Sequence, residues 1–100
     1  MSLTEKQHED TIAEFAENIE RTGVTFGQIA QALGGTERYA RQVAELKAKN
    51  LEDPWVLRNY LLAQAQARGV ALRPFTALVG DYHRYWFLDG AYIDRGRFAA

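Results

Sequence analysis

The spacing of apolar side chains predicts a first helix that ends at Gly23. Its apolar side repeats at three- and four-residue steps, whereas the opposite side is acidic and faces solvent. Either Ser2 or Thr4 begins the helix, because each hydroxyl is followed three residues later by Glu or Gln in a capping box. Glycine accepts the left-handed backbone that commonly ends a helix. The side chains expected inside are His8, Ile12, Phe15, Ala16 and Ile19.

Two shorter helices are expected next, over residues 26–33 and about 37–49. Thr25 and Thr36 precede these helices, and each hydroxyl can cap a free backbone N–H. Between the helices stands a glycine pair, and Gly34 supplies the positive φ that a tight turn needs. Two helices joined in this way have the layout of a helix-turn-helix.

The second helix of such a pair commonly enters the major groove of DNA, so its outward side chains are candidate base readers. Arginine suits the O6 and N7 atoms of guanine, glutamine suits N6 and N7 of adenine, and a helix N-terminus suits a phosphate. The predicted DNA-contacting residues are Thr36, Arg38, Arg41 and Gln42. The two glutamates of this helix oppose such binding, and Gly35 and Ala40 stand where apolar and branched residues are usual. The alternative is an ordinary helix pair with a solvated outer face.

A fourth helix is predicted to follow the N-cap Asp53, from Pro54 to Arg68. Asp53 is a favourable N-cap, and Pro54 at the first helical position lacks an N–H that would be unpaired there. The run over residues 55–62 is apolar on nearly every side, which is typical of a helix packed on two sides. Gly69 ends the helix.

The last quarter of the chain has a different character, with seven of the twelve aromatic side chains in residues 75–98. A short irregular or helical turn is expected over residues 75–79. Asp89-Gly90 between apolar arms is typical of a type I′ hairpin. The predicted fold is mainly α: one small four-helix domain over residues 1–100, containing a helix-turn-helix-like pair, with a short C-terminal β-hairpin.

Length and composition fit one soluble domain. The 100 residues are 47% hydrophobic and contain no cysteine, which excludes disulfides and thiolate metal sites. The charged N-terminus is unlike a signal peptide, and no apolar run approaches the ~20 residues that span a bilayer, so we expect a cytoplasmic protein. The net charge is −1, but the six acidic side chains of residues 4–22 stand apart from residues 36–49, which are net basic. Any phosphate-driven affinity should therefore be weak.

A second candidate site is the aromatic block of residues 81–87. Its members Tyr82, His83, Tyr85 and Trp86 are expected to bury a dimer surface or close the core, and a ligand pocket is the alternative. Asp81 can orient His83 as a base, but no Ser or Cys nucleophile stands nearby. His8 has no partner at metal-ligand spacing. We therefore expect no enzyme activity, catalytic residue, metal or cofactor.

Several unusual strings resemble a known family, and the resemblance runs from the Met-Ser-Leu-Thr start to about residue 96. They are Glu52-Asp-Pro-Trp-Val-Leu-Arg-Asn-Tyr-Leu61, Pro74-Phe-Thr-Ala-Leu78, Gly80-Asp-Tyr-His83 and Tyr85-Trp-Phe-Leu88. These strings resemble the bacterial domain-of-unknown-function family 2316. The resemblance implies a small bacterial protein with a helix-turn-helix-like N-terminal part, and it implies no established activity or site residue.

Taken together, the sequence favours a DNA-binding transcriptional regulator with double-stranded DNA as its partner. A lone module of this size usually dimerises to recognise a two-fold site. The aromatic block and the fourth helix are the candidate dimer surfaces. The alternatives are a protein-interaction module without a nucleic-acid partner, and a small-ligand binder around Asp81 and His83. No membrane partner is expected.

Overall fold

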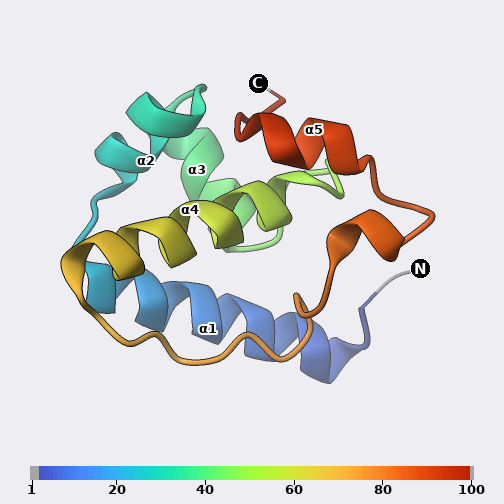
Figure 1. The fold of residues 1–100 in the computed structure, drawn as a ribbon, viewed down its shortest axis with the longest axis horizontal. Helices are drawn as coiled ribbons and strands as arrows, with labels where there is room; N and C mark the ends of the chain where they lie inside the picture. The colour runs from blue at the N-terminus through green and yellow to red at the C-terminus, as the bar shows by residue number, and fades with distance from the viewer. Residues whose placement is uncertain (1–2, 100) are drawn as a thin grey trace.

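Helix α4 (Asp53–Arg68) runs through the middle of the molecule and contacts the four other α-helices (Figure 1). The structure is a computed structural model and describes residues 3–99, which occupy about 32 × 26 × 22 Å. No helix of this part of the chain is long and apolar enough to cross a membrane. The remaining elements are α1 (Glu5–Thr22), α2 (Phe26–Leu33), α3 (Glu37–Ala44), the 3-10 helix η1 (Tyr82–Arg84) and α5 (Gly90–Arg95).

Helix α1 begins and ends where the sequence predicts. Thr4 is the N-cap and forms a capping box with Gln7, and Gly23 ends the helix with φ 77°. Ser2, the alternative cap, lies outside the described residues. The prediction of the buried face was partly wrong. Its buried residues are Thr11, Glu14, Phe15, Asn18, Ile19 and Thr22, whereas His8 and Ala16 are exposed.

The reason for this difference is a neighbour that the spacing pattern does not reveal. The chain over residues 70–80 has no helix or strand and runs along α1 (Figure 1). Its peptide groups need hydrogen-bond partners where they are covered. Asn18 bonds both the N–H and the C=O of Arg73, and Glu14 accepts from the N–H and hydroxyl of Thr76. Polar side chains are therefore buried on α1 because they bind a loop. The helical alternative over residues 75–79 does not form.

The predicted helix pair is present and tightly joined. The Thr25 and Thr36 hydroxyls accept the N–H groups of Gln28 and Tyr39, respectively. Gly34 and Gly35 both have positive φ, 96° and 81°. Residues with a Cβ rarely adopt this backbone, so the Gly-Gly turn follows from local chemistry.

Helix α3 is shorter than predicted, because it ends at Ala44 and not near Lys49. Leu46 adopts φ 55°, its N–H bonds the Val43 carbonyl, and the Lys47 N–H bonds the Gln42 carbonyl. These two bonds are a Schellman motif, which usually has glycine at the left-handed position. A leucine there gives no signal in the sequence that the helix stops.

The start of α4 also differs from the prediction, because Asp53 does not act as the N-cap. Glu52 takes the N-cap position without a side-chain cap. Asn50 Oδ1 instead accepts the N–H groups of Glu52 and Asp53, each at 2.9 Å. The Asp53 carboxylate is thus free to bond elsewhere, and it is fully buried.

The predicted C-terminal hairpin is wrong, since residues 3–99 contain no strand and have a fifth α-helix instead of a four-helix arrangement. Asp89 caps α5 by accepting the Tyr92 N–H at 3.1 Å. An aspartate side chain that caps a helix competes with the turn that Asp-Gly otherwise favours. The helix places Ile93 in the core at 1% exposure.

One hydrophobic core unites all parts of the described chain. Its fully buried members come from all five α-helices, and they include Phe15, Ile29, Val43, Leu57, Leu61 and Ile93. The short helices α2 and α5 are therefore stabilised mainly by packing, because isolated helices of this length are marginal in water.

Candidate functional site

The outer face of α3 is open to solvent, whereas its inner face is buried. Ala40, Val43 and Ala44 are covered by the core. Thr36 and Arg38 are exposed at the N-terminal end of the helix. The first predicted site therefore lies on a helix that is fixed to the core by one side and accessible on the other.

Arg41 and Gln42 lie further along α3. Arg41 is exposed, and its guanidinium lies over the Phe26 ring of α2 at 4.4 Å from the ring centre. Stacking of this kind orients an arginine without neutralising its charge. Gln42 is half-buried. It is therefore the least accessible of the four predicted DNA-contacting residues.

The two glutamates of this segment are engaged by neighbours. A Cβ built on Gly27 would lie 2.7 Å from Glu37 Oε1, so this carboxylate folds against α2. Glu45 forms an ion pair with Lys47 at 3.2 Å. Within residues 3–99, neither Arg38 nor Arg41 forms an ion pair.

The C-terminal tail adds a basic side chain beside the α2–α3 turn. The Phe98 N–H bonds the Leu33 carbonyl at 2.7 Å, which fixes the tail against the end of α2. The Arg97 guanidinium lies over Gly34, where a built Cβ would come within 3.0 Å of it. Arg97 thus adds a third exposed arginine to Arg38 and Arg41 of α3.

Asp53 joins α3, α4, α5 and the tail. Its carboxylate accepts hydrogen bonds from the Tyr39 hydroxyl, from the Tyr92 hydroxyl at 2.6 Å and from the Ala99 N–H at 3.2 Å. Burial and this carboxylate raise the pKa of Tyr39 and of Tyr92 far above the ordinary tyrosine value. Both tyrosines therefore stay protonated and keep donating.

A second polar cluster joins η1 to α5. The His83 ring lies between two carboxylates, with Nδ1 2.7 Å from Asp81 and Nε2 2.7 Å from Asp94. Tyr82 also donates its hydroxyl to Asp94. The imidazole packs against the start of α5, where a Cβ built on Gly90 would lie 2.7 Å from His83 Cδ2. Glycine is needed there for space.

The same contacts set the charges of this cluster. Hydrogen bonds to Asp94 and then Asp81 raise the pKa of His83 above its ordinary value. The pKa of Asp81 is lowered mainly by the His83 backbone N–H, and that of Asp94 mainly by the Tyr82 hydroxyl. Because both ring nitrogens face carboxylates, the imidazolium is held as a double donor and is not poised as a free base.

We predict that a proton NMR titration will find His83 with a pKa above about 6.5, the ordinary histidine value. The protonated cluster stabilises the folded protein below that value, and the contribution is lost as pH rises through the raised pKa. The lowered pKa values of the two aspartates act at the acidic end. Their contribution to the stability of the fold is lost as pH drops below about 4.

Asp94→Asn should lower the pKa of His83 more than Asp81→Asn does, since Asp94 is its stronger partner. Asp10→Asn is the control, because Asp10 pairs with Lys6 on α1. An unchanged His83 titration in Asp94→Asn would contradict the described geometry.

The aromatic block does not act as one surface. Tyr82 and Tyr85 are half-buried and cover Trp55 of α4, with ring centres 5.8 and 5.7 Å away. His83 is exposed and belongs to the carboxylate cluster. Trp86 points outward with 87% of its area exposed. The block is thus divided into two core-covering tyrosines, one ion-pairing histidine and one free tryptophan.

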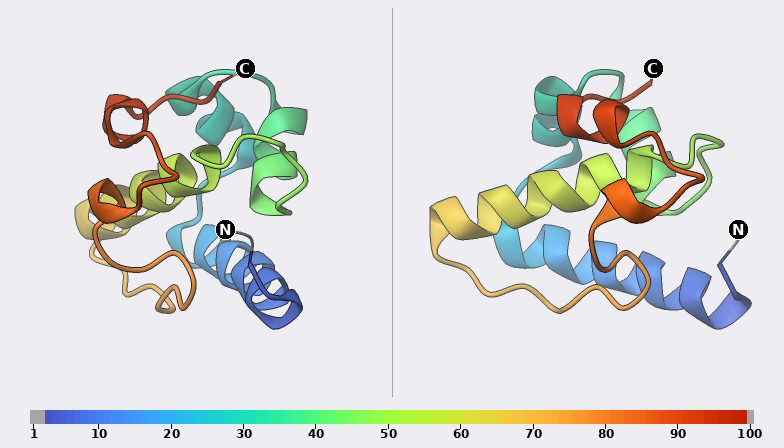
Figure 2. Two further views of the ribbon diagram at one scale, coloured as in Figure 1. Left: turned by 90° about the vertical axis from the view of Figure 1, so that its right-hand side faces the viewer. Right: turned by 45° about the vertical axis from the view of Figure 1, so that its right-hand side comes forward.

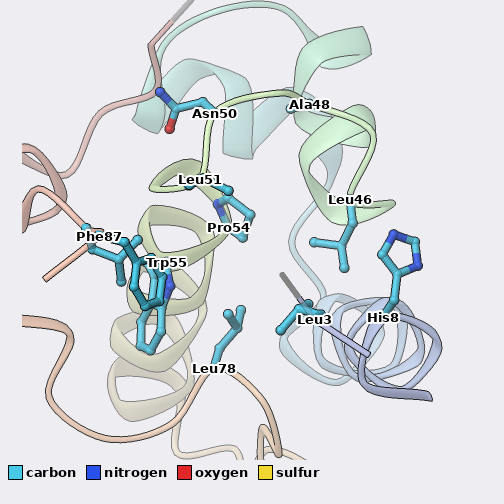
Figure 3. A pocket seen from close by; sticks show the side chains of 11 residues that line it. Leu3, His8, Leu46, Ala48, Asn50, Leu51, Pro54, Trp55, Leu78 and Phe87 are labelled. Atoms are coloured by element: carbon cyan, nitrogen blue, oxygen red, sulfur yellow. The ribbon is translucent and has the colours of Figure 1, made fainter. Parts of the chain in front are cut away.

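An apolar groove, which we call the Leu51 groove, lies between the N-terminal ends of α1 and α4. It has a volume of about 260 Å³ and its walls include Leu3, Leu46, Leu51, Pro54, Leu78 and Phe87. Trp55 and Phe87 lie along one side of it, with Leu46 and His8 on the other (Figure 3). Its polar lining side chains are His8 and Asn50, and Asn50 Oδ1 is already bonded to the start of α4.

Sequence reasoning missed Asp53, Asp94 and the Leu51 groove. Asp94 stands eleven residues from His83, and no local pattern connects them. The sequence pattern predicts that Asp53 caps a helix, whereas its carboxylate is buried and bonds other parts of the fold. Within residues 3–99, no group of three or more His, Cys, Asp or Glu side chains is placed to hold a metal ion.

Comparison with protein families finds a match that covers residues 1–89 and therefore ends before α5. The matching family is described as an uncharacterised protein conserved in bacteria, DUF2316. Comparisons with curated proteins and with solved structures gave no match. The family match spans most of the chain and agrees with the resemblance of its unusual strings. The chain, with its capped helix pair and aromatic C-terminal segment, therefore belongs to the DUF2316 family of bacterial proteins.

Proposed function

We propose that this protein binds double-stranded DNA as a transcriptional regulator, with α3 in the major groove. The observation that carries the proposal is the division of α3 into two faces. Its inner residues are buried, while Thr36, Arg38 and Arg41 are exposed on the outer face. A helix held in this way can contact base edges in the major groove, and the core need not rearrange.

The charges around α3 support the proposal. Arg38 and Arg41 supply guanidinium groups suited to guanine, and Arg97 stands beside the turn, where a phosphate would approach. The opposition expected from Glu37 and Glu45 is weakened, because one folds against α2 and the other pairs with Lys47.

Two acidic side chains of α1 are directed to the loop of residues 70–80 and not to α3. Glu14 accepts the Thr76 N–H, and Glu17 forms an ion pair with Arg73. Both carboxylates therefore face residues 70–80. Figure 2 shows that this loop and α3 lie on opposite sides of the molecule. These two carboxylates are thus held away from α3, although α1 itself contacts α3.

A binding protein also fits better than an enzyme of the acid–base type. Both ring nitrogens of His83 are occupied by carboxylates. The hydroxyl of Thr76 donates to Glu14. Neither group is free to attack or deprotonate a substrate.

Arg38→Ala is expected to weaken DNA binding by about 1–3 kcal/mol, the usual cost of losing a base contact. Fluorescence anisotropy with duplexes selected from a random-sequence library would measure it at two salt concentrations. Affinity should fall as salt rises, because phosphate contacts release counterions.

Arg73→Ala is the matched control, since Arg73 belongs to the loop of residues 70–80, and this loop lies on the side opposite α3 (Figure 2). Equal affinities for the Arg38 and Arg73 variants would overturn the placement of α3 in the groove. Binding that is absent, or indifferent to salt, would overturn the proposal as a whole.

A further inference from the structure

Exposed apolar side chains line the Leu51 groove or stand next in sequence to residues that line it. Four of the large apolar residues that stand out from the surface border the Leu51 groove or adjoin a residue of its wall. They are Leu3, Leu51, Val79 and Trp86, with 38, 56, 43 and 87% of their areas exposed. A patch of this kind around an apolar groove is typical of a protein interaction site.

The backbone that carries the outward-pointing Trp86 is held by its surroundings. It stands in a tight turn closed by the hydrogen bond from the Leu88 N–H to the Tyr85 carbonyl, 3.0 Å. The turn is anchored on both sides, because Tyr85 donates its hydroxyl to the Val79 carbonyl and the Asp89 N–H bonds Glu52. An anchored turn loses little backbone entropy when a partner covers it.

The groove is suited to a side chain of this size. A cavity of about 150 Å³ holds a benzene molecule, so a volume of 260 Å³ has room for a bicyclic indole. Small-molecule sites are usually larger and contain several convergent polar groups. Here one of the two polar lining side chains, Asn50, is already engaged. An apolar side chain therefore fits this groove better than a polar metabolite does.

The protruding indole and the groove are neighbours on the same surface. The Trp86 ring centre lies 5.8 Å from that of Phe87, and Phe87 lines the Leu51 groove. When a protruding side chain and a groove lie side by side, a two-fold axis allows each copy to insert its side chain into the groove of the other. The contact closes as a dimer and does not continue as a filament.

We propose that a second copy of this chain occupies the Leu51 groove, with Trp86 of each protomer inserted into the groove of its partner. A standard interface covers about 800 Å² on each partner, against a total surface of 5997 Å² here. A buried tryptophan supplies about 150–250 Å² of this area. The other exposed apolar side chains form the rest of the centre, and surrounding polar residues form the rim.

This dimer does not depend on DNA binding, although α3 leads directly into the loop that forms one groove wall. Leu46, two residues beyond the end of α3, lines the groove. A dimer built here therefore fixes two α3 helices relative to each other. Recognition of a two-fold operator requires such a fixed relation.

Sedimentation equilibrium of the protein without DNA tests the proposal, over about 1 μM to 1 mM, the range of moderate to weak affinities. The wild-type protein should dimerise within this range, and Trp86→Ala should weaken dimerisation at least tenfold. Trp86 fluorescence should shift to shorter wavelength as concentration rises, in step with the dimer fraction. Far-UV circular dichroism checks that each variant folds.

Leu51→Ser and Leu62→Ser form a matched pair, because both leucines are exposed but Leu62 stands on α4 and does not line the groove. Only Leu51→Ser should weaken the dimer, and Arg38→Ala should leave it intact. A protein that stays monomeric, or a Trp86→Ala dimer as tight as wild type, would refute the proposal. Binding of monomers to neutral phosphatidylcholine vesicles would also refute it.

Discussion

Asp53→Ala is expected to destabilise the fold by about 3–4 kcal/mol, the largest effect of any single substitution considered for this protein. The carboxylate is fully buried, and its removal leaves the hydroxyls of Tyr39 and Tyr92 and the Ala99 N–H without their acceptor. Each buried donor that loses its partner costs about 1–3 kcal/mol. Because the two tyrosines are partly exposed, the total loss of stability should lie near the lower end of the range that three such donors give.

Urea unfolding followed by circular dichroism measures this loss, and the melting temperature should fall by about 15–25 °C. Asp94→Ala is the control, because Asp94 also accepts a tyrosine hydroxyl but is exposed. Water replaces the lost partner there, so the loss of stability should be much smaller. Equal losses in the two variants would mean that burial does not strengthen the Asp53 contacts.

The Asp53 contacts also bear on the proposed function. Tyr39 is on α3, and Asp53 is the first residue of α4. Tyr39 packs edge-on against Phe98 of the tail, with ring centres 5.4 Å apart. Asp53 therefore holds both the candidate DNA-contacting helix and the segment that carries Arg97. A Tyr39→Phe protein keeps the ring but loses one of these bonds.

Local chemistry allowed much of the fold to be predicted. Thr25 and Thr36 cap helices through bonds to residues three positions away, so their neighbours in the sequence contain the needed information. Gly34 and Gly35 have the backbone that only glycine adopts readily. The helix pair and the outward position of Arg38 and Arg41 follow from these features and from the apolar spacing.

Features that depend on distant partners were not predictable in the same way. The Asp89-Gly90 pair suits a hairpin turn, but Asp89 caps a helix and Gly90 makes room for His83. Asp53 has the local properties of a cap, but its partners stand 14, 39 and 46 residues away. Short sequence patterns are silent about such pairs, so tertiary contacts decided both positions.

The Leu51 groove was hidden for a related reason. Its walls come from α1, from the loop after α3, from the start of α4 and from residues 78–88. The sequence pattern of each of these segments predicts only an ordinary core or loop segment. Only their juxtaposition leaves an apolar surface without a covering side chain, beside a tryptophan that has no neighbour to cover it.

Asn18→Ala is expected to destabilise the protein by about 2–3 kcal/mol and to release residues 70–80 from α1. The Asn18 side chain is fully buried and bonds the Arg73 carbonyl at 2.9 Å and the Arg73 N–H at 2.8 Å. The Asn18 amide thus bonds both peptide groups of Arg73, as a neighbouring strand would in a sheet. Alanine leaves both peptide groups without a partner. Urea unfolding measures the loss, and hydrogen exchange at Arg73 should become faster.

Asn18→Asp separates the two bonds of this contact. A carboxylate still accepts the Arg73 N–H, but it repels the Arg73 carbonyl to which the amide donates, so this variant should also be destabilised. Gln66→Ala is the control, because Gln66 is exposed on α4. Since the loop carries Leu78 to the wall of the Leu51 groove, its release should weaken the dimer together with the fold. Unchanged exchange at Arg73 would show that Asn18 does not anchor the loop.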